Sequence, residues 1–168
     1  LIAGHETGPA QPGPEALITP DDRDALQAGV YAMQALTEGK VHLAVGPQGH
    51  AALTGLDAVE LHKFSGPHPA GDPSVQVSHV APPKGGGVVW WVRAWDLLEI
   101  GRLLLSGEFP NERVYAAVGD GVQSPRLVKT VLGAPLEHIV GDTHDQDLRW
   151  IRGSVLTGES SLPLLLKI

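Results

Sequence analysis

The 168-residue sequence contains no cysteine. Disulfides, thiolate zinc sites, cysteine-ligated iron–sulfur clusters and cysteine nucleophiles are therefore excluded from this chain. It also lacks any apolar run close to the ~18 residues that a membrane-spanning helix needs. We expect any association with a membrane to depend on partner proteins.

Basic residues are scarce as well. Twelve Lys and Arg residues stand against 19 Asp and Glu, which gives a net charge of -7. This balance disfavours nucleic-acid binding, which relies on basic side chains that neutralise phosphates. Apolar residues make up 42% of the chain, enough for one sizeable domain or for a domain with a smaller unit. The chain begins with Leu1 rather than Met, and we expect it to be a piece of a longer protein.

Two amphipathic helices are the clearest local features. The sequence Thr-Pro-Asp-Asp at residues 19–22 has the pattern of a capping box and predicts a helix over residues 20–38. Apolar residues recur with helical spacing again over residues 97–105, just before Ser106-Gly107. Both helices need a sheet or other helices to pack against, because fixing a backbone costs about 1–2 kcal/mol per residue.

Short β-branched or alternating stretches predict the strands, while residues 4–18, rich in Gly and Pro, predict a long loop. The predicted strands cover residues 1–3, 41–45, 58–63, 75–80, 88–93 and 113–118. Helices and strands in this order indicate an α/β fold with a largely parallel sheet. We predict a Rossmann-like layered domain over residues 1–121.

The pattern changes beyond residue 121. A strand over residues 126–131, one or two helical turns at residues 135–140 and a strand over residues 148–152 follow one another closely. This order predicts a small β-grasp-like unit, complete or truncated, over residues 122–168.

Eight histidines raise the question of a metal site. His62, His68 and His79 are the closest set, but their spacing matches neither H-E-x-x-H nor H-x-H, and no carboxylate clearly completes them. We therefore expect no metal site.

The glycine runs do not form a phosphate-binding loop. Gly85-Gly86-Gly87 precedes a predicted strand, whereas phosphate binds to the N-terminal amides of a helix. The glycines at residues 46–49 and 119–121 lack the G-x-G-x-x-G spacing, and the sequence contains no G-x-S-x-G. We expect no catalytic and no cofactor-binding residue in this chain.

Two features could instead present side chains to a ligand or a partner. Trp90 and Trp91 lie in a predicted strand and should face opposite sides, so we expect Trp90 in the core and Trp91 at an interface. Residues 64–71 hold two prolines and two glycines around His68, which restricts the loop to few shapes. This loop is either a rigid crossover or a device that presents His68.

Several short motifs, in order along the chain, resemble those of one protein family. They are Leu-Thr-Glu-Gly-Lys-Val at residues 36–41, Ser-Gly-Pro-His-Pro-Ala-Gly at 65–71, the helix ending in Ser-Gly-Glu at 106–108, Pro-Arg-Leu-Val-Lys-Thr with Leu-Gly-Ala at 125–134, and Gly-Ser-Val-Leu-Thr-Gly at 153–158. The family is that of the A subunits of the bacterial Na+-translocating NADH:quinone oxidoreductases. The resemblance spans essentially the whole chain.

The resemblance implies a fold and a setting. The middle of these subunits is a Rossmann-like domain joined to a β-grasp unit of the SLBB type. The complex oxidises NADH, reduces ubiquinone and exports Na+, and its flavins and iron–sulfur centre lie on other subunits. The chain would then be a peripheral scaffold on the cytoplasmic side of the bacterial inner membrane. Ubiquinone is the one ligand that the resemblance associates with it.

The resemblance and the loop together give the candidate contacts with quinone or with a partner. These are Gly66, His68, Pro69, Gly71, His79 and Trp91. The sequence differs from the family pattern at Asp72-Pro73, directly after this loop, and at residues 84–87. The alternatives are a flavin- or dinucleotide-binding oxidoreductase domain, a ligand-binding β-grasp adaptor, and a protein similar to the C subunit of Rnf-type complexes.

Overall fold

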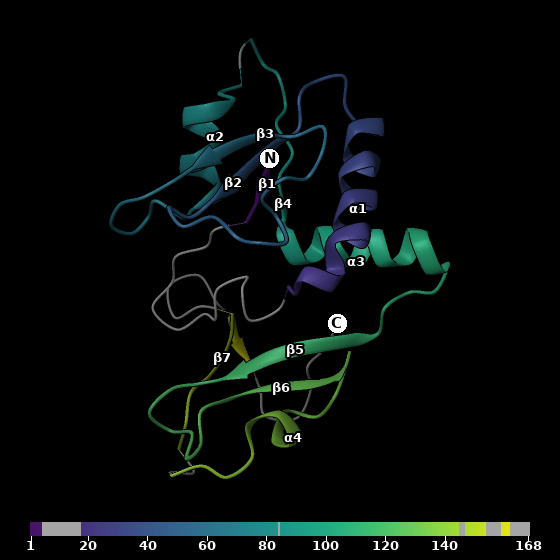
Figure 1. The fold of residues 1–168 in the computed structure, drawn as a ribbon. Helices are drawn as coiled ribbons and strands as arrows, with labels where there is room; N and C mark the ends of the chain where they lie inside the picture. The colour runs from purple at the N-terminus through teal and green to yellow at the C-terminus, as the bar shows by residue number, and fades with distance from the viewer. Residues whose placement is uncertain (5–17, 84, 145–146, 154–158, 162–168) are drawn as a thin grey trace. The chain divides into compact units, whose positions relative to one another are not determined.

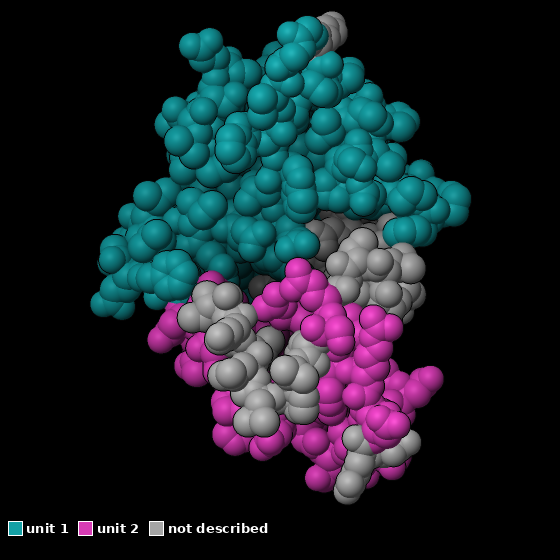
Figure 2. Space-filling model, turned by 180° about the vertical axis from the view of Figure 1, so that it is seen from behind, with its two compact units in different colours: residues 1–7, 13–110 teal, residues 8–12, 111–168 magenta. Residues whose placement is uncertain are grey.

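The computed structural model describes residues 1–4, 18–83, 85–144, 147–153 and 159–161. The predicted loop over residues 4–18 and the motif at 153–158 thus fall almost entirely outside the described residues. The described residues divide into two compact units, one up to Pro110 and the other from Asn111 onward (Figure 2). Among the described residues, no helix combines the length and the apolar character that crossing a bilayer requires.

The first unit contains a four-stranded sheet in which all neighbouring strands are parallel (Figure 1). The strands are β1 (Ile2–Ala3), β2 (His42–Val45), β3 (Glu60–Lys63) and β4 (Val92–Arg93). Their spatial order is β3-β2-β1-β4, so the short first strand lies inside the sheet and bonds to a strand on each side. The predicted α/β fold with a parallel sheet is confirmed.

Both predicted amphipathic helices are present. A 3-10 turn, η2 (Pro20–Asp22), leads into α1 (Arg23–Ala35), and α3 (Ala94–Ser106) ends at Gly107, whose left-handed φ of 74° suits glycine. The two helices bury their apolar faces in one core with the sheet, and Leu26, Val30, Leu43 and Leu97 are fully buried there.

The helices α1 and α3 cross with their backbones in contact. A Cβ atom on Gly29 would lie 2.6 Å from the carbonyl oxygen of Leu97, and one on Gly101 would lie 1.7 Å from that of Ala25. Glycine inside a helix costs about 1 kcal/mol relative to alanine. Here the missing side chains allow the close crossing, which explains glycine at both positions.

The segment predicted as a strand over residues 75–80 is a helix, and that prediction was wrong. The helix α2 (Pro73–Val80) starts at Asp72, whose carboxylate accepts a hydrogen bond of 2.7 Å from the backbone N–H of Ser74. Proline at the first helical position and an aspartate cap are start signals for a helix. They outweigh the imperfect alternation of valines on which the strand prediction relied.

The second unit is an antiparallel hairpin with a short helix and a smaller strand pair. Strands β5 (Glu112–Ala117) and β6 (Arg126–Val131) pair along their whole length, followed by α4 (Leu136–Val140). Strands β7 (Trp150–Arg152) and β8 (Glu159–Ser161) form the second pair. The predicted boundary at residue 121 lies too far along the chain, because the pairing of β5 with β6 places β5 in the second unit.

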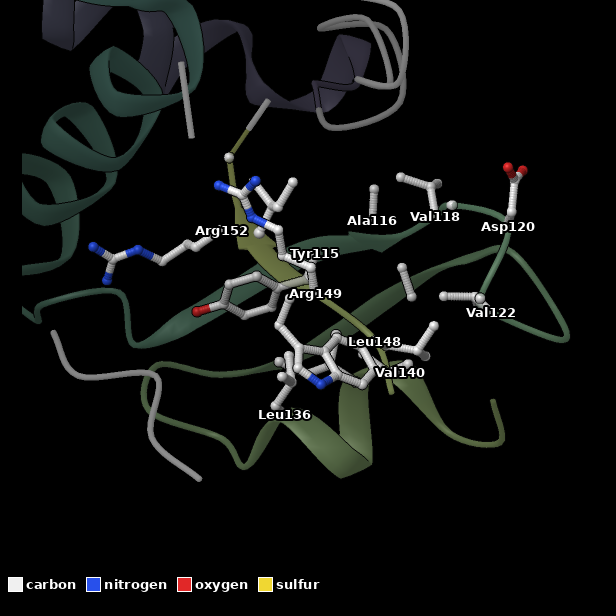
Figure 3. Close-up of a pocket in the computed structure, with 17 residues that line it drawn as sticks. Tyr115, Ala116, Val118, Asp120, Val122, Leu136, Val140, Leu148, Arg149 and Arg152 are labelled. Carbon is white, nitrogen blue, oxygen red and sulfur yellow. The ribbon is translucent and has the colours of Figure 1, made fainter. Parts of the chain in front are cut away.

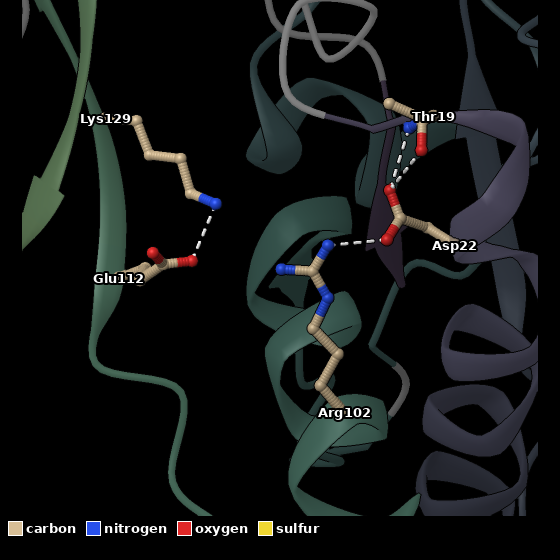
Figure 4. Close-up of polar contacts among 5 residues, drawn as sticks. All are labelled: Thr19, Asp22, Arg102, Glu112 and Lys129. Atoms are coloured by element: carbon tan, nitrogen blue, oxygen red, sulfur yellow. Dashed lines mark hydrogen bonds and ion pairs between the residues drawn. The ribbon is translucent and has the colours of Figure 1, made fainter.

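One buried carboxylate links the start of the first long helix to α3 (Figure 4). The Asp22 carboxylate accepts hydrogen bonds of 2.9 Å from the backbone N–H and the hydroxyl of Thr19, and one of 2.5 Å from the guanidinium of Arg102. Burial alone would raise the pKa of Asp22, but the bonds from Thr19 and Arg102 outweigh it and lower this pKa. The predicted capping box is confirmed, and the guanidinium of Arg102 on α3 adds a further hydrogen bond to it. The same figure shows an ion pair between Lys129 and Glu112, 2.7 Å long. It is exposed to solvent and therefore contributes little to the stability of the fold.

We expect Asp22→Asn to lower the free energy of unfolding at pH 7 by about 1.5–3 kcal/mol, the range for hydrogen bonds to a charged group. Because the folded-state pKa of Asp22 is lowered, its contribution is complete above its unfolded pKa and is lost as the pH falls through the folded value. The difference in the free energy of unfolding between wild type and Asp22→Asn, measured by urea unfolding, should therefore become smaller at acid pH. An equal gap at neutral and at strongly acid pH would contradict this account.

Candidate functional site

A pocket of about 660 Å³ opens at the amino ends of the parallel strands. Residues at the starts of β1, β2 and β4 contribute to it, together with the end of α1 and the segment before β4. We call it the tryptophan pocket; its lining includes Met33, Leu36, His42, Val88, Trp90 and Trp91. Nucleotides bind to folds of this class at the carboxyl ends of the strands, so this pocket lies at the opposite edge.

Both tryptophans of the pocket are exposed: Trp90 by 82% and Trp91 by 48%. The expectation that Trp90 lies in the core was therefore wrong. It assumed a strand over residues 88–93, but β4 begins only at Val92, so strand alternation does not apply to these side chains. The guanidinium of Arg93 lies 5.8 Å from the ring centroid of Trp91, a cation–π distance that favours an ordered ring.

The loop after β3 is sharply turned. Gly66 has a φ of 142°, the His68–Pro69 peptide bond is cis, and Gly71 is buried. The Asp72 N–H donates to the carbonyl of Pro69 at 2.8 Å. Hydrogen bonds from Ser74 and, more weakly, the charge of His68 lower the pKa of Asp72. The loop therefore closes on the cap of α2 and leaves His68 exposed beside it.

His79 lies on α2, and its ring is engaged locally. Its Nδ1 lies 2.8 Å from the carbonyl oxygen of Val75, and the ring packs edge-on against Phe64 with centroids 6.4 Å apart. Among the predicted contacts, only Trp91 lines the tryptophan pocket. The loop residues precede α2 and His79 lies in its last turn, and none of them is in the lining of the pocket.

A polar cluster lies on β2 and β3. His42 Nδ1 is 3.1 Å from His62 Nε2 and 3.4 Å from Glu60 Oε2, and Lys40 pairs with the other oxygen of Glu60. Burial lowers the pKa of His42, His62 lowers it further, and Glu60 raises it. The side chain of His42 is 14% exposed and also lines the tryptophan pocket.

The second unit has a smaller pocket of about 310 Å³ (Figure 3). Side chains from β5, from α4 and from residues 148–153 line it, among them Tyr115, Leu136, Leu148 and Arg152. Tyr115 and Leu136 also pack against the core of this unit. The pocket is thus the open side of a small hydrophobic core, with arginines at its rim.

Comparison with known families decides the class of the protein. Residues 1–109 match the model described as NqrA second alpha/beta domain, and residues 114–162 match that described as NQRA C-terminal domain. The chain belongs to the NqrA family. The two matches are consistent with the two units of the structure, and they support the SLBB character expected for the second one.

Individual NqrA relatives cover nearly all of the chain. The A subunit of the Na(+)-translocating NADH-quinone reductase of Klebsiella pneumoniae subsp. pneumoniae is 40% identical over 159 residues, 94% of this chain. The corresponding protein of Shewanella amazonensis is 36% identical over 162 residues, 96% of this chain, and that of Neisseria meningitidis serogroup B is 35% identical over 159 residues, 94% of it. The match takes in 35% of the Klebsiella and Neisseria proteins and 36% of the Shewanella protein, so the chain spans about a third of their length.

Membership of the NqrA family confirms the resemblance and favours it over the Rnf-type alternative. Trp91, a contact predicted from the sequence, lines the tryptophan pocket, and its role stays a prediction. No sequence motif singles out His42 and Glu60, because only the pairing of β2 with β3 brings them beside His62. The signal available was weak: two short strands, each carrying a histidine.

Proposed function

We propose that this chain is the central part of the A subunit of a Na+-translocating NADH-quinone reductase. In that complex it would act as a peripheral scaffold and help to shape the site where ubiquinone is reduced. The observation that carries this proposal is the 40% identity over 94% of the chain to a protein of that name. The partners would be the other subunits, which would hold the flavins and the iron–sulfur centre and keep the chain at the cytoplasmic face of the inner membrane.

The tryptophan pocket supports a contact with quinone. Its volume of about 660 Å³ falls in the ~300–1,000 Å³ range of small-molecule sites. The lining is largely apolar, which suits an isoprenoid tail, and the Trp91 ring offers a face for stacking on a quinone ring. Thr37 and Lys40 also line the pocket and carry donors that can reach carbonyl oxygens.

The rim of the same pocket supports docking onto another protein of the complex. Leu36, Val88 and Trp90 are 78%, 77% and 82% exposed, and all three line the pocket. Large apolar side chains gathered in this way mark interaction surfaces, and Trp is enriched where binding energy concentrates. A partner that covers this rim would enclose the pocket and remove water from a bound quinone.

A reconstituted complex tests the proposal with Trp91→Ala. We expect the KM for quinone to rise roughly tenfold through loss of ring stacking, while oxidation of NADH with an artificial electron acceptor stays unchanged. Phe109→Ala is the matched control, because Phe109 is 65% exposed in the same unit and is not in the pocket lining. Equal effects of the two variants, or none from Trp91→Ala, would contradict the quinone contact.

Photo-crosslinking with a quinone analogue in the same complex separates the candidate surfaces. Labelling of residues 88–92 supports the tryptophan pocket, and labelling of residues 65–79 supports the loop that presents His68. Labels only on residues 115–122 or 148–153 would move the contact to the pocket of the second unit. His68→Ala, assayed separately for NADH oxidation and quinone reduction, tests the loop directly.

The flavin- or dinucleotide-binding alternative is supported by the parallel sheet of the first unit. It predicts a tightly bound flavin, and therefore a yellow protein after purification. A colourless chain that takes up no flavin would eliminate the flavin-binding form of this alternative.

A further inference from the structure

Three polar side chains share one face of the sheet at its β3 edge. In the parallel pairing of β2 with β3, His42 lies opposite Glu60 and Ala44 lies opposite His62. Successive strand residues alternate between faces, so His42, Glu60 and His62 all point away from the face that carries Leu43. The fold thus places two imidazoles and a carboxylate together without any sequence motif.

The distances within this set suit coordination of one ion. Three donor atoms, one from each side chain, lie within 4.8 Å of one another. His42 Nδ1 is 3.1 Å from His62 Nε2 and 3.4 Å from Glu60 Oε2. Bonds of about 2.0–2.1 Å in a tetrahedral site put neighbouring donors about 3.3–3.4 Å apart. Both measured separations lie close to that value.

We propose that His42, His62 and Glu60 bind one divalent transition-metal ion per chain, with Zn2+ as the best match. Imidazole nitrogens select zinc and its neighbours over Mg2+ and Ca2+, which prefer oxygen donors. Two histidines and one glutamate supply three protein ligands and leave a fourth position for water or another ligand. The set is distinct from His68 and His79, which lie in the loop and on α2.

The surroundings favour ordered ligands. Lys40 pairs with Glu60 Oε1 and leaves Oε2 directed at His42, so the carboxylate is already oriented. Outer partners of this kind fix the position of a ligand. Without metal, the two rings share a hydrogen bond between His42 Nδ1 and His62 Nε2. A metal ion would take the place of the proton between the rings and bind the lone pairs of His42 Nδ1 and His62 Nε2.

Calorimetric titration of the chelator-treated, tag-free chain with ZnCl2 tests the site. We expect saturable binding of one Zn2+ per chain. His62→Ala should weaken binding at least about tenfold, since even loss of an outer partner costs 10–100-fold in affinity. Glu60→Gln should weaken it as well, and a Co2+-loaded chain should show the intense visible bands of a tetrahedral site. His79→Ala, a change of a histidine in the same unit outside the cluster, should leave binding as in wild type.

Three outcomes would overturn the proposal. The first is that the chain binds no Zn2+ saturably. The second is that wild type and His62→Ala bind Zn2+ with equal affinity. The third is that His62→Ala and His79→Ala lose Zn2+ affinity to the same extent. Circular dichroism establishes that each variant is folded. If His62→Ala does not fold, His62→Gln is used in its place. The titration uses the chain alone, so its result does not depend on the role proposed for the quinone reductase complex.

Discussion

Replacing Gly101 with alanine is expected to lower the free energy of unfolding of the first unit by about 3 kcal/mol or more, at or beyond the upper end of the usual range for overpacking. The new Cβ atom would lie 1.7 Å from the carbonyl oxygen of Ala25 and 2.5 Å from its carbonyl carbon. A flexible side chain could move aside, but here the obstacle is the backbone of α1. The two helices must therefore separate, and the core between them must loosen.

Gly39→Ala is the matched control for this prediction. A Cβ atom at Gly39 would meet only the hydroxyl of Thr37 at 3.4 Å, and its φ is not left-handed. Urea unfolding followed by circular dichroism, with amide exchange in α1 and α3, measures both variants. Similar stabilities for Gly101→Ala and Gly39→Ala would show that the close crossing is not needed.

Leu43→Ala should lower the free energy of unfolding by about 2–5 kcal/mol, the range for removing a fully buried leucine. Leu43 is 0% exposed and belongs to the core that joins the sheet to α1 and α3. The truncation leaves a cavity in the middle of the unit, where the flanking helices and strands can collapse only in part. Native-state hydrogen exchange of the β2 amides measures the loss locally.

The neighbouring strand supplies the control. Leu61 pairs in register with Leu43 and shares its face of the sheet, but it is 40% exposed. Leu61→Ala should cost about 1–1.5 kcal/mol, in proportion to the surface that it buries. Comparable losses for both variants would mean that burial does not set the stability of this sheet.

Local sequence signals predicted those parts of the fold that local interactions determine. The Thr-Pro-Asp-Asp start of the first helix and the Ser-Gly end of the second are short-range features, and both helices were placed to within a few residues. Strand β6 was predicted with its observed limits because alternation is strong there. The start signal at Asp72-Pro73 was equally local, but it was overlooked in favour of the valine pattern.

Contacts distant in sequence could not be read in the same way. Nothing in residues 112–117 reveals whether that strand joins the parallel sheet or pairs with the strand that follows, which is why the domain boundary was misplaced. The meeting of His42 with His62 depends on the register of two strands. The exposure of Trp90 depends on where β4 begins.

The shortest strands have a consequence for how the unit assembles. Ile2 and Ala3 pair with β2 on one side and with β4 on the other, so this two-residue strand lies between the two parts of the sheet. During synthesis β1 emerges well before its partner at Val92, which is among the last parts of the unit to be made. Contacts so distant in sequence slow folding. Until Val92 emerges, one edge of β1 remains unpaired and open to aberrant pairing with other chains.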